Sequence, residues 1–480
     1  MVRSVCIRNA DWVVAWDAKA GRHNYRQNAD LVFAGDRITH VGPGYAGPVD
    51  EEVSGKGRMV MPGLVNLHTH PSVMPVFKSI REELANPKLY FTALYDGWNL
   101  FRPEPEDCVW AARQAYCEAL LSGCTTLVDM CFPFPGWLDV MAESGLRIFI
   151  SALYESQHWH SANGHELTYV PEPDGGKGAF EAAVTLTAET RAHPSGRLSA
   201  MIAPMAIDTT SVDLIRKGLE LARAEKLPFQ LHAGEAMAEF LEMTRRTGMT
   251  QMQLLAKEKL LGPDVTIGHG IFLDHHSWLH WYTREDVKIL ADHGCSVAHC
   301  PTPFSRYGIK LEDFGAYLKA GINMGIGTDT HPHNILEEMR TAAILARIAA
   351  ENTYAVSTTD IFHAATVGGA KALMRDDIGR LTPGAKADIV VVRLDIPDMM
   401  PAYDPLRSLI YIAADRAVKD VYVDGRKVVG DGRVLTMNHM EAAEQVAAAQ
   451  RRILPKVPSR DRHGRGAEEV APRTLPLAHG

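Results

Sequence analysis

Histidines and an aspartate stand at the ends of apolar segments, a placement that can support metal-dependent chemistry. His68 and His70 end the segment 59–70. Alternate residues of an extended strand point the same way, so both imidazoles leave this strand end toward one point. Three further apolar segments also end in such residues: His232, His269 and Asp329. Imidazole and carboxylate groups suit zinc, iron(II) or a similar first-row ion, so the sequence predicts a metal site among these five residues.

An acidic residue follows one of these histidines closely. Glu235 lies three residues after His232, where a carboxyl group can reach a metal-activated water or the substrate. Such a group can carry a proton from water to a leaving group, as general acid–base catalysis requires. The alternative is an acidic residue in the first turn of a helix, where the helix dipole favours it. We predict the catalytic role.

Eight short apolar segments alternate with amphipathic segments between residues 59 and 385, which is the pattern of parallel βα units. A serine-capped segment at 211–226 and a segment that ends on Gly123 are typical of the helices between such strands. We expect an α/β protein built on a (β/α)8 TIM barrel, with catalytic groups at the carboxyl ends of its strands. The predicted strands are 59–70, 124–130, 146–154, 198–205, 227–235, 264–270, 295–301 and 322–329.

Strand-like segments return on both sides of this region. Residues 1–58 and 386–440 combine β-branched residues with Gly and Asp-Gly turns. We expect them to form one small composite β-sandwich domain beside the barrel of residues 59–385. A closing helix is predicted at 441–455. The polar, Pro- and Arg-rich segment 456–480 is predicted to be flexible.

Charge and cysteine content narrow the class of protein. The net charge is −8 and the isoelectric point is near 6.2, which gives no electrostatic case for a nucleic acid or a membrane partner. The seven cysteines form no CxxC pair, and no signal peptide or membrane span is recognisable. We therefore expect a cytoplasmic protein with reduced thiols that acts on a small molecule.

Several motifs together resemble the amidohydrolase superfamily. They are PGLVNLHTH, HAGE, IGHG, AHCP, GIGTD followed by EEMR, and GAKADIVVV, spread over about residues 5–440. The chain is most similar to the branch that contains triazine hydrolases, guanine deaminase and adenosine-derivative deaminases. The resemblance implies a metal-dependent hydrolase with a split β domain around its barrel.

The resemblance also implies roles for particular residues. His68, His70, His232 and Asp329 match the ligands of one divalent metal, for which we expect Zn²⁺, with Fe²⁺ or Mn²⁺ as alternatives. Asp329 would also take a proton from water, and Glu235 would pass a proton to the leaving group. His269 would polarise the attacked centre, orient the water or bind the metal. Strand four lacks the lysine of binuclear relatives, so we expect a single metal.

The residues around this site bear on the substrate. We predict substrate contacts from five residues: Met205, His158, Trp159, Phe304 and Tyr307. A rim of Met and aromatic side chains favours an apolar or aromatic substrate, unless these side chains only pack loops on the barrel. Three residues close to Asp329 are candidates to orient it: His331, His333 and Asn334.

These inferences favour hydrolytic deamination of a small aromatic or heterocyclic substrate, at a carbon–nitrogen bond other than a peptide bond. Three alternatives use the same mechanism: hydrolysis of an amide, of a phenylurea or of a (thio)carbamate. Dechlorination of a heterocycle is another. The remaining alternative is a metal-binding scaffold without catalysis, against which Glu235 and Asp329 argue, since a structural metal needs no proton shuttle. The resemblance implies a homodimer or a homotetramer.

Overall fold

Parallel strands form the centre of the computed structural model, which describes residues 3–80 and 86–478. Eight strand positions follow the chain in order. Six of them lie within the segments predicted from the sequence, β7 extends one residue beyond its segment, and the first predicted segment is divided between two sheets. The eight positions are β6 (Leu64–Asn66), β7 (Cys124–Cys131), β8 (Arg147–Tyr154), β11 (Leu198–Ala200) with β12 (Ala203–Pro204), β13 (Phe229–Ala233), β14 (Val265–His269), β15 (Ser296–His299) and β16 (Asn323–Ile326).

Backbone pairing groups these strands into two sheets, and isolated bridges connect the two sheets. β6, β7, β8 and β11 pair in one sheet, and β13 to β16 pair in a second. A parallel bridge between Ile202 and Phe229 joins the two sheets beside β12 and β13, and a bridge between Thr69 and Asp329 joins them beyond β6 and β16. At the second junction the Asp329 N–H donates to the His68 carbonyl at 2.8 Å. The two segments with candidate ligands therefore meet at this junction.

The predicted strand at 59–70 is wrong in its first part. The chain instead forms β5 (Arg58–Pro62), which pairs with β1 and β17 outside the parallel strands, and β6 begins only at Leu64. The change of sheet falls at Gly63, whose N–H donates to the Asp388 carbonyl at 2.9 Å. A Cβ on Gly63 would lie 2.0 Å from the Thr125 hydroxyl oxygen. β5 and β6 are both buried and apolar, so the sequence shows no polar break where the chain passes from one sheet to the other.

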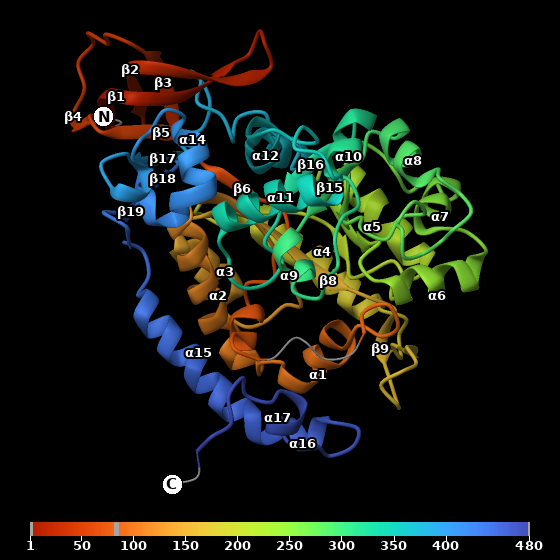
Figure 1. Cartoon of the computed structure of the whole chain (residues 1–480). Helices are drawn as coiled ribbons and strands as arrows, with labels where there is room; N and C mark the ends of the chain where they lie inside the picture. Colours follow the sequence, from red (N-terminus) through yellow and green to blue (C-terminus); the bar gives the residue numbers. More distant parts are fainter. Residues whose placement is uncertain (1–2, 81–85, 479–480) are drawn as a thin grey trace.

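Both ends of the chain contribute to a single hydrogen-bonded sheet, the composite sheet (Figure 1, upper left). The Ile38 N–H donates to the Ala385 carbonyl at 2.9 Å, which brings β3 back to the segment before β17. The composite sheet therefore curls over its own buried face. Besides β5, its strands are β1 (Ser4–Asp17), β2 (Arg22–Ala34), β3 (Arg37–Gly42), β4 (Glu51–Ser54), β17 (Ile389–Arg393), β18 (Val418–Val423), β19 (Arg426–Gly430) and β20 (Arg433–Val434).

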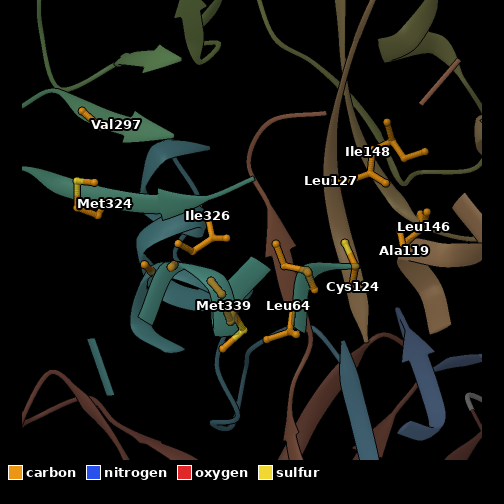
Figure 2. Close-up of a cluster of buried hydrophobic side chains, with 14 of the residues drawn as sticks. Leu64, Ala119, Cys124, Leu127, Leu146, Ile148, Val297, Met324, Ile326 and Met339 are labelled. Carbon is orange, nitrogen blue, oxygen red and sulfur yellow. The ribbon is translucent and has the colours of Figure 1, made fainter. Parts of the chain in front are cut away.

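Helices cover the parallel strands and bury an apolar layer between strand and helix. Figure 2 shows part of this layer, where Leu127 and Ile148 of two strands lie near Ala119 of α2. The Ser211 side chain accepts the Leu214 N–H, which confirms the predicted helix start. The helices are α2 (Pro105–Leu121), α3 (Trp137–Ser144), α4 (Lys177–Ala192), α5 (Val212–Glu225), α6 (Met237–Thr247), α7 (Gln251–Lys257), α8 (Asp286–Asp292), α9 (Pro301–Ser305), α10 (Phe314–Ala320), α11 (Ile335–Ala349), α12 (Thr358–His363) and α13 (Gly369–Ala372).

The C-terminal part of the chain packs against the molecule. Helix α15 (His439–Ile453) lies along α2, and α16 (Val457–Arg460) lies beside α1 (Trp98–Phe101) (Figure 1). The prediction of a flexible segment is therefore wrong for residues 457–470, whereas residues 473–478 are exposed and form no helix or strand. Val457 and Val470 are buried in a cluster with Leu100 and Phe101. Widely spaced apolar residues in a polar segment give no periodic signal, which explains the error.

No helix among the residues that the structure describes is long and apolar enough to cross a membrane.

A buried ion pair joins the parallel strands to the composite sheet. The Arg147 guanidinium, at the start of β8, donates two hydrogen bonds of 3.2 Å to Asp388, just before β17, and a third to Asp424. We expect Asp388→Asn to lower the free energy of unfolding by about 3 kcal/mol, because it leaves a buried guanidinium undercompensated. Urea unfolding checks this, with Asp213→Asn in an exposed ion pair as the control. Equal midpoints for the two variants would contradict it.

Candidate active site

Three histidines and an aspartate converge where the parallel strands end. The Nε2 atoms of His70 and His232 lie 3.4 Å apart. Asp329 Oδ1 lies 3.3 Å from His70 Nε2 and 3.7 Å from His68 Nε2. His269 joins the cluster from β14, with its ring centroid 4.7 Å from that of His68. Five residues from four separate segments of the sequence thus place nitrogen and oxygen atoms around one point.

Oxygen atoms behind the imidazole rings fix how the rings face. Nδ1 of His70 donates to the Met130 carbonyl at 2.7 Å, and Nδ1 of His232 donates to the Met205 carbonyl. Nδ1 of His68 donates to the side-chain oxygen of Gln230. Each ring is therefore protonated on Nδ1, and its Nε2 lone pair is directed at the centre of the cluster. This is the tautomer that binds a metal ion through Nε2.

The donor set fits a divalent metal. His68 Nε2 and both ring nitrogens of His269 are buried and have no hydrogen-bond partner among the described residues. Folded proteins seldom leave buried polar atoms unpaired without a functional reason. Two overlapping groups bring their ligand atoms within 4.8 Å of one another, His68 with His232 and His269, and His68 with His70 and Asp329. Imidazole nitrogen and carboxylate oxygen are ligands that zinc accepts.

Burial sets the charge of this cluster. It lowers the pKa of His68 to about 4 and the pKa values of His232 and His269 well below the usual range. These imidazoles are therefore neutral, as metal ligands must be. Burial alone would raise the pKa of Asp329, but the side-chain hydrogen bond with His70 and the electrostatic influence of the neighbouring histidines lower it below its ordinary value. Asp329 is accordingly a carboxylate.

Glu235 has the opposite electrostatics, although it lies nearby. Its Oε1 is 3.8 Å from His269 Nε2, and its side chain is 10% exposed. Burial raises the pKa of Glu235 well above its ordinary value, and repulsion from Asp329 raises it further. Glu239 holds the Glu235 backbone by accepting its N–H at 2.8 Å. The two carboxyl groups of the site therefore have pKa values shifted in opposite directions, which suits one of them to donate a proton and the other to accept one.

Two site residues have strained backbones. His269 has φ = 76° and Asp329 has φ = 57°, in the left-handed region that residues with a side chain rarely adopt. Such strain costs on the order of 1–3 kcal/mol and concentrates at functional sites. The surrounding pairing, including the bond from the Asp329 N–H to His68, maintains these conformations.

A cavity of about 640 Å³ opens onto the cluster, and His70, His232, Glu235 and Asp329 line it. The five residues predicted to contact a substrate also line it: Met205, His158, Trp159, Phe304 and Tyr307. The Phe304 ring meets the His269 ring edge to face at 4.7 Å between centroids. The aromatic side chains therefore form walls of the cavity close to the histidines.

The three residues predicted to orient Asp329 lie in different places. His331 lines the cavity, and its Nε2 is 3.4 Å from the Arg306 guanidinium. The Asn334 side chain instead accepts the Glu337 N–H at 3.2 Å and caps α11. The His333 ring lies 3.7 Å from the Glu118 carboxylate. Asn334 and His333 therefore support helices α11 and α2.

Two buried polar residues of the strands were missed. Gln230 accepts from His68 and donates to the Leu67 carbonyl at 3.1 Å. Asn66 exchanges two hydrogen bonds with Thr328, the neighbour of Asp329. Each stands two residues before a candidate ligand, so it shares the ligand's face of the strand. A polar residue at that position in an apolar run is the signal that would have found both.

The contact of Gln230 with His68 predicts an effect on metal affinity. We expect Gln230→Met to weaken zinc binding about 10- to 100-fold, because His68 loses the acceptor that orients its ring. Competition with a chromophoric chelator measures this. Gln450→Met is the control, since that amide bonds backbone carbonyls of residues 76 and 78 away from the cluster. Equal zinc affinity in wild type and Gln230→Met would contradict the role.

A family model and several curated proteins match most of the chain. A family model described as "Amidohydrolase family" matches residues 59–428. The 5'-deoxyadenosine deaminase of Methanosarcina mazei is 27% identical over 459 residues, which cover 95% of this chain and 99% of that protein. The 5-methylthioadenosine/S-adenosylhomocysteine deaminase of Halothermothrix orenii is 30% identical over 410 residues, 84% of this chain and 89% of that protein.

Two solved structures share the fold. Atrazine chlorohydrolase from Arthrobacter aurescens, complexed with zinc, has a TM-score of 0.79 at 24% identity and covers 93% of this chain and 100% of its own. An adenosine deaminase from Xanthomonas campestris with bound zinc has a TM-score of 0.79 at 24% identity and covers 94% of this chain and 98% of its own.

Proposed function

The chain belongs to the amidohydrolase family, and on that premise we propose that it hydrolytically deaminates a small aromatic heterocycle at a single-metal site. The observation that carries the proposal is the position of two carboxyl groups beside the histidine cluster, with Glu235 Oε1 at 3.8 Å from His269 Nε2 and Asp329 Oδ1 at 3.3 Å from His70 Nε2. Deamination needs both a base for water and an acid for the leaving nitrogen. The named relatives that are deaminases support this reaction type.

We assign the metal to His68, His70, His232 and Asp329. A bound divalent ion, zinc in our proposal, would supply Lewis acidity that lowers the pKa of a water molecule. The unpaired, neutral Nε2 of His68 supports this assignment. The segment of β11 and β12 carries no lysine that a second ion would need, which supports one ion per site.

The side chains then divide the proton transfers. Asp329 accepts a proton from the attacking water. Its Oδ1 lies 3.3 Å from His70 Nε2, among the atoms that would hold the metal and its water. His269 is buried, which lowers its pKa, and it would steady the charge that develops on the substrate's nitrogen or oxygen when the carbon is attacked. Glu235 donates its proton to the departing nitrogen. His269 also remains a candidate ligand, because its nitrogens lie within the same cluster.

The cavity supports the substrate class. Its volume of about 640 Å³ lies in the range of small-molecule sites. Phe304, Tyr307 and Trp159 offer aromatic surfaces, and Met205 offers an adaptable apolar one. These surfaces favour a planar ring. Arg102, Arg306, Glu155 and Glu172 also line the cavity and would accommodate polar substituents on that ring.

Hydrolysis of an amide, phenylurea or (thio)carbamate, or dechlorination of a heterocycle, is the second candidate. The apolar rim favours it, and one structural neighbour is a chlorohydrolase.

We also propose the finer architecture, a closed (β/α)8 barrel with a composite β-sandwich of residues 1–58 and 386–440, assembled into a homodimer or homotetramer. The bridges at both junctions of the parallel strands support the closed barrel.

A panel of substrates tests the proposed function. Zinc-loaded protein is incubated with aminopurines, pterins, aminotriazines, chlorotriazines, anilides, phenylureas and thiocarbamates, and products are identified by mass spectrometry. Exchange of an amino group for oxygen, with ammonia released, is the expected result. Cleavage into an amine and an acid fragment, or release of chloride, would establish the second candidate and overturn deamination.

A further inference from the structure

The segment 86–103 forms one wall of the cavity and includes the short helix α1. Two residues of α1, Leu100 and Phe101, line the cavity. The residues that follow the candidate ligand His70 line it as well: Val73, Met74, Phe77 and Ile80. The later members of this list pack against the same buried cluster as α1. The cavity therefore extends from the candidate metal ligands to a second, apolar part.

The C-terminal segment completes this apolar part. Val470, the last residue of α17 (Ala467–Val470), lines the cavity and is buried in one cluster with Leu100 and Phe101. Val457 of α16 belongs to the same cluster but does not line the cavity. This segment lies beyond the part of the chain that matches the family model. We call Leu100, Phe101 and Val470 the apolar end of the cavity.

Backbone polar groups at the apolar end already have a charged partner. The Arg460 guanidinium donates to the Leu100 carbonyl at 3.3 Å and to the Arg102 carbonyl at 2.9 Å. It also donates to the Glu104 carboxylate at 2.8 Å. Because these groups are satisfied within the protein, the apolar end offers a ligand apolar surface rather than hydrogen bonds.

A second arginine ties the wall to another side of the cavity. The Arg462 guanidinium pairs with Asp96 in the wall and donates to the Ser161 carbonyl at 3.1 Å. Ser161 directly follows β9 (Gln157–His160), the strand that contains the cavity-lining Trp159. The apolar end is therefore fixed relative to the aromatic side of the cavity, and a cavity of fixed dimensions can discriminate between substrates.

The aromatic side chains beside the histidines belong to a different cluster. Phe304, whose ring meets His269, packs there with Phe91 and Tyr307. A planar ring held by these side chains occupies only part of the cavity, because a volume of about 640 Å³ suits a drug-sized ligand. The apolar end provides room for the rest of the ligand, and burial of an apolar group there is favourable.

We propose that the apolar end binds an alkyl or aryl substituent of the heterocycle, while the ring lies beside the histidines. This inference rests on the proposed function and narrows its substrate class to an aminated heterocycle with an apolar group remote from the amino nitrogen. Val470 limits the size of that group. The C-terminal segment thereby determines specificity.

A series of substituted heterocycles tests this inference. It is built on the panel heterocycle that binds most tightly, in the form with oxygen in place of the amino group, so that turnover does not disturb binding. Derivatives carry methyl, propyl, pentyl or phenyl at each ring position open to substitution, and calorimetry with zinc-loaded protein gives their affinities. At one position we expect affinity to rise about fourfold per added CH₂ until the apolar end is filled.

Two results of the series would overturn the inference. One is an affinity that does not rise at any ring position. The other is tighter binding of a chain that ends in a carboxylate than of the alkyl chain of equal length, since the exposed Arg102, which also lines the cavity, would then recognise the substituent.

Changes at Val470 test the size of the apolar end, with Val457→Ala as the matched control. Val470→Ala should move the best substituent to a longer chain. Val470→Phe should lower the affinity ratio of pentyl to methyl about 10-fold. Val457→Ala removes the same atoms from the same cluster outside the cavity lining, so it should keep the wild-type ratios. Wild-type ratios in both Val470 variants, or an equal shift in Val457→Ala, would contradict the assignment.

Ammonia release from the aminated derivatives separates this inference from the proposed function. Affinities that follow chain length and the Val470 variants, without ammonia release from any derivative, would reject the proposed function and support the apolar end. Ammonia release with a flat affinity series would reject the apolar end alone.

Discussion

Glu235→Gln is expected to lower kcat by about 10²- to 10⁴-fold while metal content and thermal midpoint stay unchanged. The amide keeps the size of the side chain but has no proton to give to a leaving nitrogen. Burial raises the pKa of the Glu235 carboxyl, which favours its protonated form. Wild-type turnover should therefore fall as the pH rises through that pKa, and this fall should be missing in the variant.

The control for Glu235 is Glu242→Gln, the same change seven residues further along, outside the cavity lining, where the carboxylate pairs with Arg245 and Arg246. Steady-state kinetics on both variants separate a proton donor from a general effect of charge. If Glu235→Gln retained near-normal kcat with metal and fold intact, the assigned proton transfer would be wrong.

Asp329→Asn is the second change with a large expected effect. We expect turnover to drop by on the order of 10³-fold even at saturating zinc, because the amide cannot accept the proton from water. Asparagine tolerates the left-handed backbone that residue 329 adopts, so the fold should persist. Loss of the negative charge should also weaken zinc affinity, because a neutral amide is a poorer ligand.

Two measurements separate these effects of Asp329→Asn. Zinc content by mass spectrometry reports binding, and kcat at excess zinc reports proton transfer. A variant that recovers wild-type kcat once zinc is saturating would show that Asp329 only binds metal and takes no proton.

The positions of the strands and of the candidate ligands were predictable from the sequence. An apolar run that ends in His or Asp combines two local signals, and residues such as His68 and His70 share a direction through strand periodicity alone. The structure brings these residues, His232, His269 and Asp329 into one cluster. The Ser211 cap was also recognisable, since its partner Leu214 lies only three residues away.

Features that depend on distant partners were not predictable. Gln230 contacts His68 across 162 residues, and Asn66 contacts Thr328 across 262. A polar residue in an apolar run is a local signal, but nothing local identifies the distant partner that it contacts. The change of sheet at Gly63 was hidden for a related reason, because two buried strands join without a polar break. The wall at 86–103 and the packed C-terminal segment lack periodicity, so only tertiary contacts define them.

The central claim is that one metal ion at this cluster supports release of ammonia from an aromatic heterocycle. The most direct test removes the metal with a chelator and then adds zinc back in steps. At each step, ammonia release is measured with the panel compound that the protein deaminates. We predict no release without metal and a linear rise that stops at about one zinc per chain. Full release from metal-free protein, or a rise that continues to two zinc ions per chain, would contradict the account.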